Sequence, residues 1–202
     1  MLDAAVRRWI DPPLDTAAIF LSRAGVTANT LTVAGFVAGF AAVASIAGRQ
    51  YALGLTLYVF NRVLDGLDGA VARRTSVTEL GAYLDIVFDF IVYSGVPLGF
   101  AIADPSRALA ASFLIVSFVC TGTTFLAFAV FAAKRGLSTE LRGRKSFYHL
   151  GGLTEGTETF VAFALMCLFP RAFDALAYAF GTLCLVTSAG RVAAAVTALK
   201  SP

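Results

Sequence analysis

Charged residues are scarce in this chain. Only 14% of its 202 residues are charged and 58% are hydrophobic, whereas a soluble globular domain usually carries about 25% charged residues. This shortage excludes an ordinary soluble protein and indicates a protein embedded in a membrane. The net charge is only +3, and we expect membrane lipids, with no nucleic acid, among its partners.

Cysteine and histidine are also rare. Cys120, Cys167 and Cys184 lie in apolar stretches, without the spacing of a zinc site or of a disulfide framework. The single histidine, His149, has no candidate partner residue near it in the sequence. These observations argue against a zinc centre and against a fold held together by disulfides.

Long uncharged runs dominate the rest of the sequence. Residues 24–48 and 108–133 carry no charge, and each run exceeds the roughly 20 helical residues that cross a bilayer of about 30 Å. Four other apolar stretches have one charged end. The sequence therefore predicts one all-α integral membrane domain over residues 1–202, with six transmembrane helices preceded by an amphipathic interfacial helix at about 3–24. The predicted spans are about 29–48, 51–74, 79–103, 108–133, 153–169 and 173–197.

The positive charges are distributed unevenly between the two sides of this arrangement. With six alternating spans, 13 of the 16 Lys and Arg residues fall on the side of the N-terminal segment, and only Arg49, Arg107 and Arg171 fall on the other. Positively charged loops face the cytoplasm. We therefore expect cytoplasmic termini, and charged helix ends that open to the cytoplasm, in a bacterial-type inner membrane.

Two consecutive predicted spans carry four aspartates: Asp65, Asp68, Asp85 and Asp89. A charge within a bilayer costs at least ~2.5 kcal/mol, and four like charges also repel one another, so the cluster needs positive charge between its members. In an antiparallel hairpin of these two spans, Asp65 would face Asp89 and Gly69 would face Asp85. Oxygen ligands favour Mg²⁺, Mn²⁺ or Ca²⁺ over zinc, so we expect divalent cations here.

Small residues and an arginine accompany the aspartates. Gly69, Ala72 and Gly81 would leave space between the helices, and the planar fork of Arg73 suits a phosphate group. These features predict a metal-dependent site for a phosphorylated ligand. The alternative is that the acids pair with Arg62, Arg73 and Arg74 merely to hold the helices together.

The same stretch resembles the signature of the CDP-alcohol phosphatidyltransferase family. That signature is D-x-x-D-G-x-x-A-R followed by G-x-x-x-D-x-x-x-D, and all eight fixed positions match at residues 65–73 and 81–89. Seven residues separate the two halves, where the family has eight. Residues 25–32, GVTANTLT, are similar to the family's G-[IV]-T-P-N-x-L-T entry to the first span, with alanine in place of proline.

The resemblance implies an enzyme that transfers a substituted phosphate from a CDP-linked donor to an acceptor hydroxyl and releases CMP. It implies two divalent cations, Mg²⁺ or Mn²⁺, held by Asp65, Asp68 and Asp85, with Asp89 touching metal and acting as general base. The residues it implies at the CDP donor are Gly69, Ala72, Arg73, Asn29, Thr32 and Thr78.

Choice of the acceptor is expected to depend on the loop at residues 134–159 and on the last span. The acceptor-pocket candidates are Arg142, Lys145, Glu155, Glu158 and Arg191. Their alternatives are ordinary cytoplasmic positive charges, acids that complement a helix dipole, and an arginine that snorkels to the interface.

The function expected from these observations is transfer of a phosphatidyl group from CDP-diacylglycerol to a small polar alcohol, in phospholipid biosynthesis. A CDP-amino alcohol phosphotransferase acting on diacylglycerol is one alternative. A divalent-cation or proton-coupled transporter is another, because acids within a membrane often mark ion pathways. The pairs Gly35/Gly39 and Gly95/Gly99 permit close helix contact, and we expect a homodimer.

Overall fold

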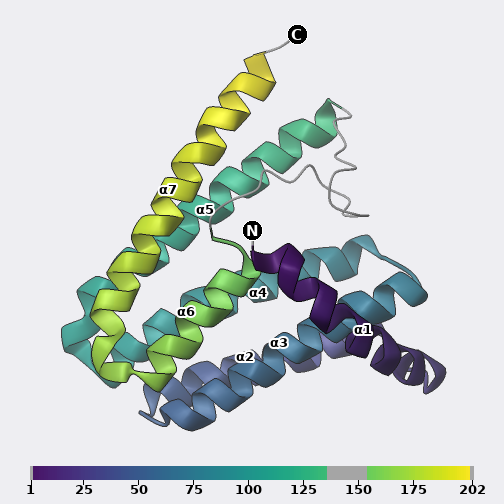
Figure 1. The fold of residues 1–202 in the computed structure, drawn as a ribbon, viewed down its shortest axis with the longest axis horizontal. Coiled ribbons are helices and arrows are strands. Elements are labelled where there is room, and N and C mark those ends of the chain that lie inside the picture. The colour runs from purple at the N-terminus through teal and green to yellow at the C-terminus, as the bar shows by residue number, and fades with distance from the viewer. Residues whose placement is uncertain (1, 136–153, 201–202) are drawn as a thin grey trace.

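The computed structural model describes residues 2–135 and 154–200, which are helical almost throughout and contain no strand. Figure 1 shows the arrangement of the helices. They are α1 (Leu2–Arg23), α2 (Ala28–Ala47), α3 (Tyr51–Arg74), α4 (Glu79–Ala103), the 3-10 turn η1 (Pro105–Arg107), α5 (Ala108–Lys134), α6 (Gly156–Leu168), the 3-10 turn η2 (Pro170–Ala172) and α7 (Phe173–Lys200).

Side-chain caps fix where three of these helices begin. The hydroxyl of Thr27 accepts a hydrogen bond from the backbone N–H of Thr30 at 3.2 Å, ahead of α2. Thr78 does the same for Gly81 at 3.1 Å, ahead of α4. At α6, the carboxylate of Glu158 accepts from the N–H of Glu155 at 3.1 Å. Such caps satisfy backbone N–H groups that have no partner within the helix.

Helix α2 packs along both α3 and α4, whereas α3 and α4 do not pack along each other. Glycines make this close packing possible. A Cβ at Gly39 would lie 2.6 Å from Cγ2 of Val92 on α4 and 3.0 Å from Nδ2 of Asn61 on α3. A Cβ at Gly99 would lie 3.0 Å from the carbonyl oxygen of Val43 on α2. The glycine pairs that led us to expect a homodimer therefore serve contacts within the chain.

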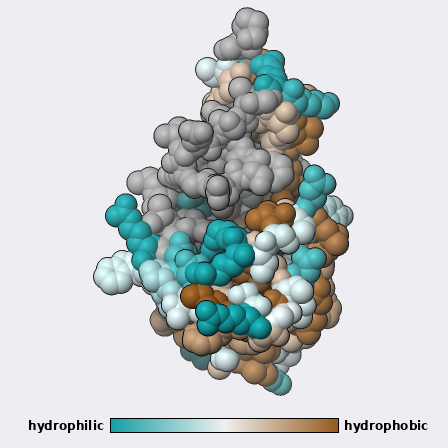
Figure 2. All heavy atoms as spheres, turned by 90° about the vertical axis from the view of Figure 1, so that its right-hand side faces the viewer, coloured by the Kyte–Doolittle hydropathy of each residue, from teal (hydrophilic) through white to brown (hydrophobic). Residues whose placement is uncertain are grey.

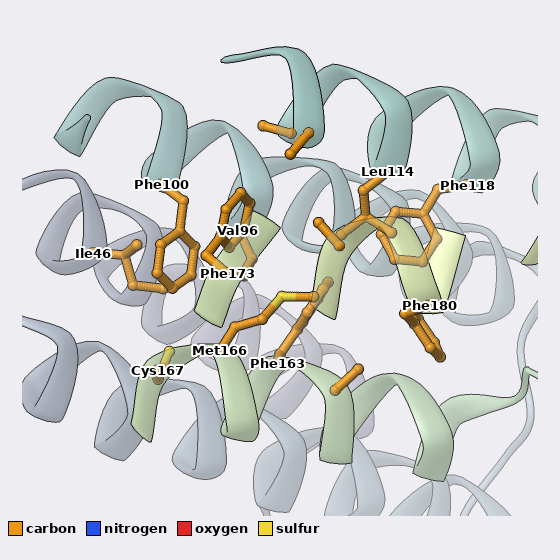
Figure 3. Close-up of a cluster of buried hydrophobic side chains, with 14 of the residues drawn as sticks. Ile46, Val96, Phe100, Leu114, Phe118, Phe163, Met166, Cys167, Phe173 and Phe180 are labelled. Atoms are coloured by element: carbon orange, nitrogen blue, oxygen red, sulfur yellow. The ribbon is translucent and has the colours of Figure 1, made fainter. Parts of the chain in front are cut away.

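The other half of the molecule is built on α5 and α7, which lie side by side in Figure 1. Together with α2, α3, α4 and α6 they enclose an aromatic core, part of which is shown in Figure 3. Phe100 of α4 stacks on Phe173 of α7 with ring centroids 4.4 Å apart. Phe163 of α6 meets Phe118 of α5 edge to face at 5.8 Å. These ring contacts hold the two halves of the bundle together.

The first helix lies across α3, as Figure 1 shows. Its Ala18 is fully buried, and its Leu14 reaches so close to α3 that a Cβ at Gly66 would lie 2.7 Å from Cδ1 of Leu14. Trp9 and Phe20 remain 84% and 67% exposed. An amphipathic helix that packs by one face and exposes large apolar side chains suits the membrane interface.

Four segments of the described chain are long and apolar enough to cross a membrane: α2, α4, η1 with α5, and η2 with α7. Their outward residues include Phe40, Leu98 and Val116, each about half exposed or more. Figure 2 views one end of the molecule, where patches of hydrophilic residues interrupt the hydrophobic surface.

The predicted all-helical fold is thus confirmed, with four segments of the described chain that could cross a membrane. That α3 and α6 also cross the membrane remains a prediction. Helix α3 has 24 residues but carries charged side chains along its second half. Helix α6 has only 13 residues, about 20 Å of helix at 1.5 Å per residue, and is shorter than the predicted span at 153–169.

Candidate metal centre

Three of the four aspartates meet in space. One carboxylate oxygen each from Asp65, Asp85 and Asp89 lies within 4.8 Å of the others. Asp68 is only 7% exposed and lines the same small cavity, which has a volume of about 10 Å³. The residues that line it with the four acids are Thr32, Gly35, Phe36, Asn61, Arg62 and Phe88. Four carboxylates around so small a space form a donor set that fits a hard divalent cation.

The centre is built by three helices, which corrects the predicted two-helix hairpin. The hairpin placed Arg73 opposite Gly81, but a Cβ at Gly81 would meet Oδ1 of Asn29 on α2 at 2.9 Å. A Cβ at Gly69 would approach only Nη1 of Arg73, at 3.3 Å, with nothing of α4 within 4 Å. At Gly81 a side chain of α2 therefore occupies the position that the hairpin assigned to Arg73, whereas the approach of Asp65 to Asp89 agrees with the hairpin.

Thr32 holds one member of the acid cluster. Its hydroxyl lies 2.6 Å from Oδ2 of Asp68 and donates to it, while the carbonyl of Ala28 lies 3.0 Å away. Both side chains are buried, at 8% and 7% exposure. A short hydrogen bond to a carboxylate is among the stronger hydrogen bonds in proteins. The structure therefore places Thr32, which the family resemblance had put near the donor, directly against a predicted metal ligand.

Arg62 was predicted only in the alternative, as an arginine that pairs with the acids to hold the helices together, and the structure places it inside the site. Its Nη2 donates to Oδ1 of Asp89 at 2.6 Å, and its Nη1 lies 3.6 Å from Oδ2 of Asp65. Its Nη1 also donates to the Tyr93 hydroxyl at 2.9 Å, and its Nε to Oδ1 of Asn61 at 2.8 Å. A signal was available, because Arg62 lies three residues before Asp65 and Tyr93 lies four residues after Asp89, each on the same helical face as its aspartate.

Some of the residues predicted at the CDP donor lie near the ends of the aspartate helices, and one of them caps a helix. Asn29 lies beside Gly81, and Arg73 lies 3.8 Å from the carboxylate of Asp15 on α1, with both side chains about half exposed. Ala72 is partly buried on the same helix. Thr78, by contrast, caps α4, a structural role in this conformation.

The residues predicted in the acceptor pocket have different environments in the structure. Arg191 is only 8% exposed, donates from Nη1 to the carbonyl of Thr121 at 3.1 Å, and has Glu155 as a charged neighbour. Its Nε has no hydrogen-bond partner among the described residues. Glu158 caps α6, in agreement with the helix-terminus alternative. Arg142 and Lys145 lie outside the described residues.

The sequence model of the family described as CDP-alcohol phosphatidyltransferase matches residues 25–198. The chain belongs to the CDP-alcohol phosphatidyltransferase family. The resemblance drawn from the aspartate signature is thereby confirmed, and the enzyme hypothesis is favoured over the transporter.

Relatives and solved structures agree with this membership. The chain is 45% identical to "Inner membrane protein YnjF" of Escherichia coli K12, over all of this chain and 98% of that protein. It is 36% identical to the phosphatidylcholine synthase of Borreliella burgdorferi over 77 residues, which are 36% of this chain and 33% of that enzyme. An inner-membrane location of the YnjF relative accords with the four apolar segments described above.

Two solved structures share the fold of this CDP-alcohol phosphatidyltransferase. Both are of the phosphatidylinositol phosphate synthase PgsA1 from Mycobacterium tuberculosis, at 24% identity. The form with CDP-DAG bound gives a TM-score of 0.65 and covers 90% of this chain and 92% of that one. The form in complex with manganese and citrate gives 0.69 and covers 91% and 89%.

Proposed function

We propose that this chain transfers a phosphatidyl group from CDP-diacylglycerol to the hydroxyl of a small polar alcohol. The observation that carries the proposal is the convergence of Asp65, Asp85 and Asp89 within 4.8 Å, beside buried Asp68, in a chain of this family. In the reaction, the acceptor oxygen forms a bond to the phosphorus of the lipid phosphate, the bond from that phosphorus to the CMP oxygen breaks, and CMP leaves.

The four carboxylates would hold two divalent cations, Mg²⁺ or Mn²⁺. Bound there, the cations would offset the charge of the donor diphosphate and stabilise the attacking and leaving oxygens. An all-carboxylate donor set fits these ions, and the manganese complex of the M. tuberculosis enzyme supports the choice.

The chain's own residues would bind the donor and move the proton. Asp89 would take the proton of the acceptor hydroxyl, because it borders the cavity and is only partly buried. At Gly69 an added Cβ would meet only Nη1 of Arg73, so the absence of a side chain would let the cytidine diphosphate approach the backbone of α3. Arg73 would bind phosphate after leaving Asp15, and a half-exposed ion pair at 3.8 Å costs little to break.

Arg191 is the best supported acceptor residue. An arginine that is 8% exposed and keeps an unsatisfied Nε among the described residues is costly in an apolar bundle, and an anionic acceptor group would satisfy it. Glu155, its charged neighbour, would then contact the hydroxyls of that acceptor.

We also propose six membrane crossings, with α1 at the interface and both termini and the acid cluster on the cytoplasmic side of a bacterial inner membrane. The positive-charge bias of the loops and the exposed Trp9 and Phe20 of α1 support this orientation. The homodimer stays a proposal, and the glycine pairs do not support it because they pack within the chain.

The test is CMP release by purified protein in lipid nanodiscs with Mn²⁺ or Mg²⁺. We expect release from CDP-diacylglycerol when the correct alcohol is present, in a panel that includes phosphorylated alcohols. Asp65→Asn is the inactive control. Release only from a CDP-amino alcohol with diacylglycerol would replace the proposed donor, and no release from any CDP-linked donor across the panel would refute the function.

A further inference from the structure

The guanidinium of Arg62 is buried against the acid cluster and is bound on every nitrogen. Nε donates to Asn61, Nη1 to the Tyr93 hydroxyl and Nη2 to Asp89, all at 2.6–2.9 Å. Only 14% of its side chain is exposed. Because each nitrogen has a partner at short distance, the arginine is held in one place by the fold.

Its surroundings also favour a cation at this place. The guanidinium carbon lies 5.2 Å from the ring centroid of Tyr93 and 5.8 Å from that of Tyr58, within the range of cation–π attraction. Asn61 is itself anchored, since its side-chain nitrogen donates to the carbonyl of Gly35 on α2 at 2.8 Å. Three helices therefore contribute to a cradle for one positive charge.

This positive charge lies against candidate metal ligands. Arg62 binds Oδ1 of Asp89 and lies 3.6 Å from Asp65, and one oxygen of each aspartate belongs to the cluster that fits a metal ion. A carboxylate has two oxygens with about four lone-pair sites, so the hydrogen bond from arginine occupies one of these sites and limits the directions from which a cation can bind. Like charges a few ångströms apart repel strongly where the effective dielectric is low.

We propose that Arg62 is a positioning residue that reserves one oxygen of Asp89 and weakens metal binding. It prevents a cation from taking both oxygens of Asp89, and so keeps this carboxylate oriented toward the acceptor hydroxyl. The inference rests on the proposed function for the role of Asp89, but its effect on metal affinity does not require turnover.

We expect loss of Arg62 to raise the affinity for Mn²⁺ and to lower the rate of CMP release. Arg62→Gln removes the charge, so Mn²⁺ binding measured by electron paramagnetic resonance, without donor, should tighten about tenfold or more. CMP release at saturating metal should fall about 10- to 100-fold, as for other groups that orient metal ligands. A merely structural role for Arg62 would weaken both.

Three variants keep the test decisive. Arg62→Lys retains the charge and should hold the Mn²⁺ affinity near that of the unaltered protein, with part of the turnover restored. Tyr93→Phe removes only the hydroxyl that accepts the hydrogen bond from Nη1 of Arg62. It should therefore tighten Mn²⁺ binding and slow CMP release, each by less than Arg62→Gln does. If Arg62→Gln fails to fold, the Tyr93→Phe variant tests the proposal in its place. Arg74→Gln removes an exposed positive charge from the same helix and should change neither.

The outcomes separate this inference from the proposed function. Unchanged or weaker Mn²⁺ binding in a folded Arg62→Gln or Tyr93→Phe protein overturns the role of Arg62 and leaves the function standing if CMP is released. Absence of CMP release by the unaltered protein overturns the function, while the Mn²⁺ comparison still decides whether Arg62 opposes the metal. An unaltered protein that binds no Mn²⁺ overturns both.

Discussion

Replacing Thr32 with valine removes one hydroxyl from the centre and leaves its shape nearly unchanged. Valine and threonine have similar volumes and the same branched Cβ, so α2 should keep its packing. The change deletes the donor that lies 2.6 Å from Oδ2 of Asp68. Because both side chains are buried, solvent has little access to replace the lost hydrogen bond.

The size of the effect follows from the role of the bond, which holds a candidate metal ligand in place. Loss of a group that orients a metal ligand typically costs about 10- to 100-fold in metal affinity. We therefore expect the Mn²⁺ concentration that gives half-maximal CMP release to rise by roughly 10- to 100-fold. The maximal rate should fall less, because the four carboxylates are all retained.

The assay is CMP release as a function of Mn²⁺ concentration, with direct Mn²⁺ binding as a second readout. Thr56→Val is the matched control, since Thr56 is an exposed residue of α3 whose hydroxyl donates to the carbonyl of Ala52 at 3.0 Å. A Thr32→Val protein whose metal dependence stays within roughly twofold of the unaltered protein, a difference below about 0.5 kcal/mol, would refute the reasoning.

Three further predictions concern the base, the packing and the metal. Asp89→Asn should lower CMP release by roughly 10²–10⁴, the usual contribution of a general base, while much of the Mn²⁺ binding remains; full turnover would remove Asp89 as the base. Gly39→Ala should lower the Tm in detergent, because its Cβ would lie 2.6 Å from Val92 and overpacking costs about 1–3 kcal/mol. Gly190→Ala, with nothing within 4 Å, should not lower the Tm, and equal Tm values would contradict the packing argument. EDTA should abolish CMP release and added Mn²⁺ or Mg²⁺ should restore it; activity that persists in EDTA would exclude a metal-dependent reaction.

Much of the helical architecture could be predicted from hydrophobicity and charge. Segments without charge have to be helices if they cross a bilayer, because only a helix satisfies its backbone groups within one segment. The turn between α3 and α4 was also recoverable, since charged residues end one helix and Thr78 caps the next. The predicted span at 153–169 is longer than α6 mainly at its start, because Glu155 is the N-cap and the helix begins at Gly156. At its end it passes Leu168 by one residue.

The aspartates of the site could be predicted from the sequence, but the residues that contact them could be predicted only in part. Asp65, Asp85 and Asp89 recur at helical spacing, so their convergence followed from an antiparallel arrangement of α3 and α4. The hairpin picture omitted α2, and with it the contacts of Thr32 with Asp68 and of Asn29 with Gly81. Arg62 was considered only as a cytoplasmic-side charge and as a structural partner of the acids, because a charge at the end of an apolar run usually faces water.

What the sequence determined by itself is the chemistry: four carboxylates, small residues and arginines at fixed helical spacing, in a chain too apolar for water. These properties are local, since they depend on residue type and on 3.6 residues per turn. Only the tertiary structure decided that α2 packs against both aspartate helices, and which positive charge lies among the acids. Helix packing sets those contacts, and a glycine such as Gly39 determines how closely α2 approaches its neighbours only once both of them are in place.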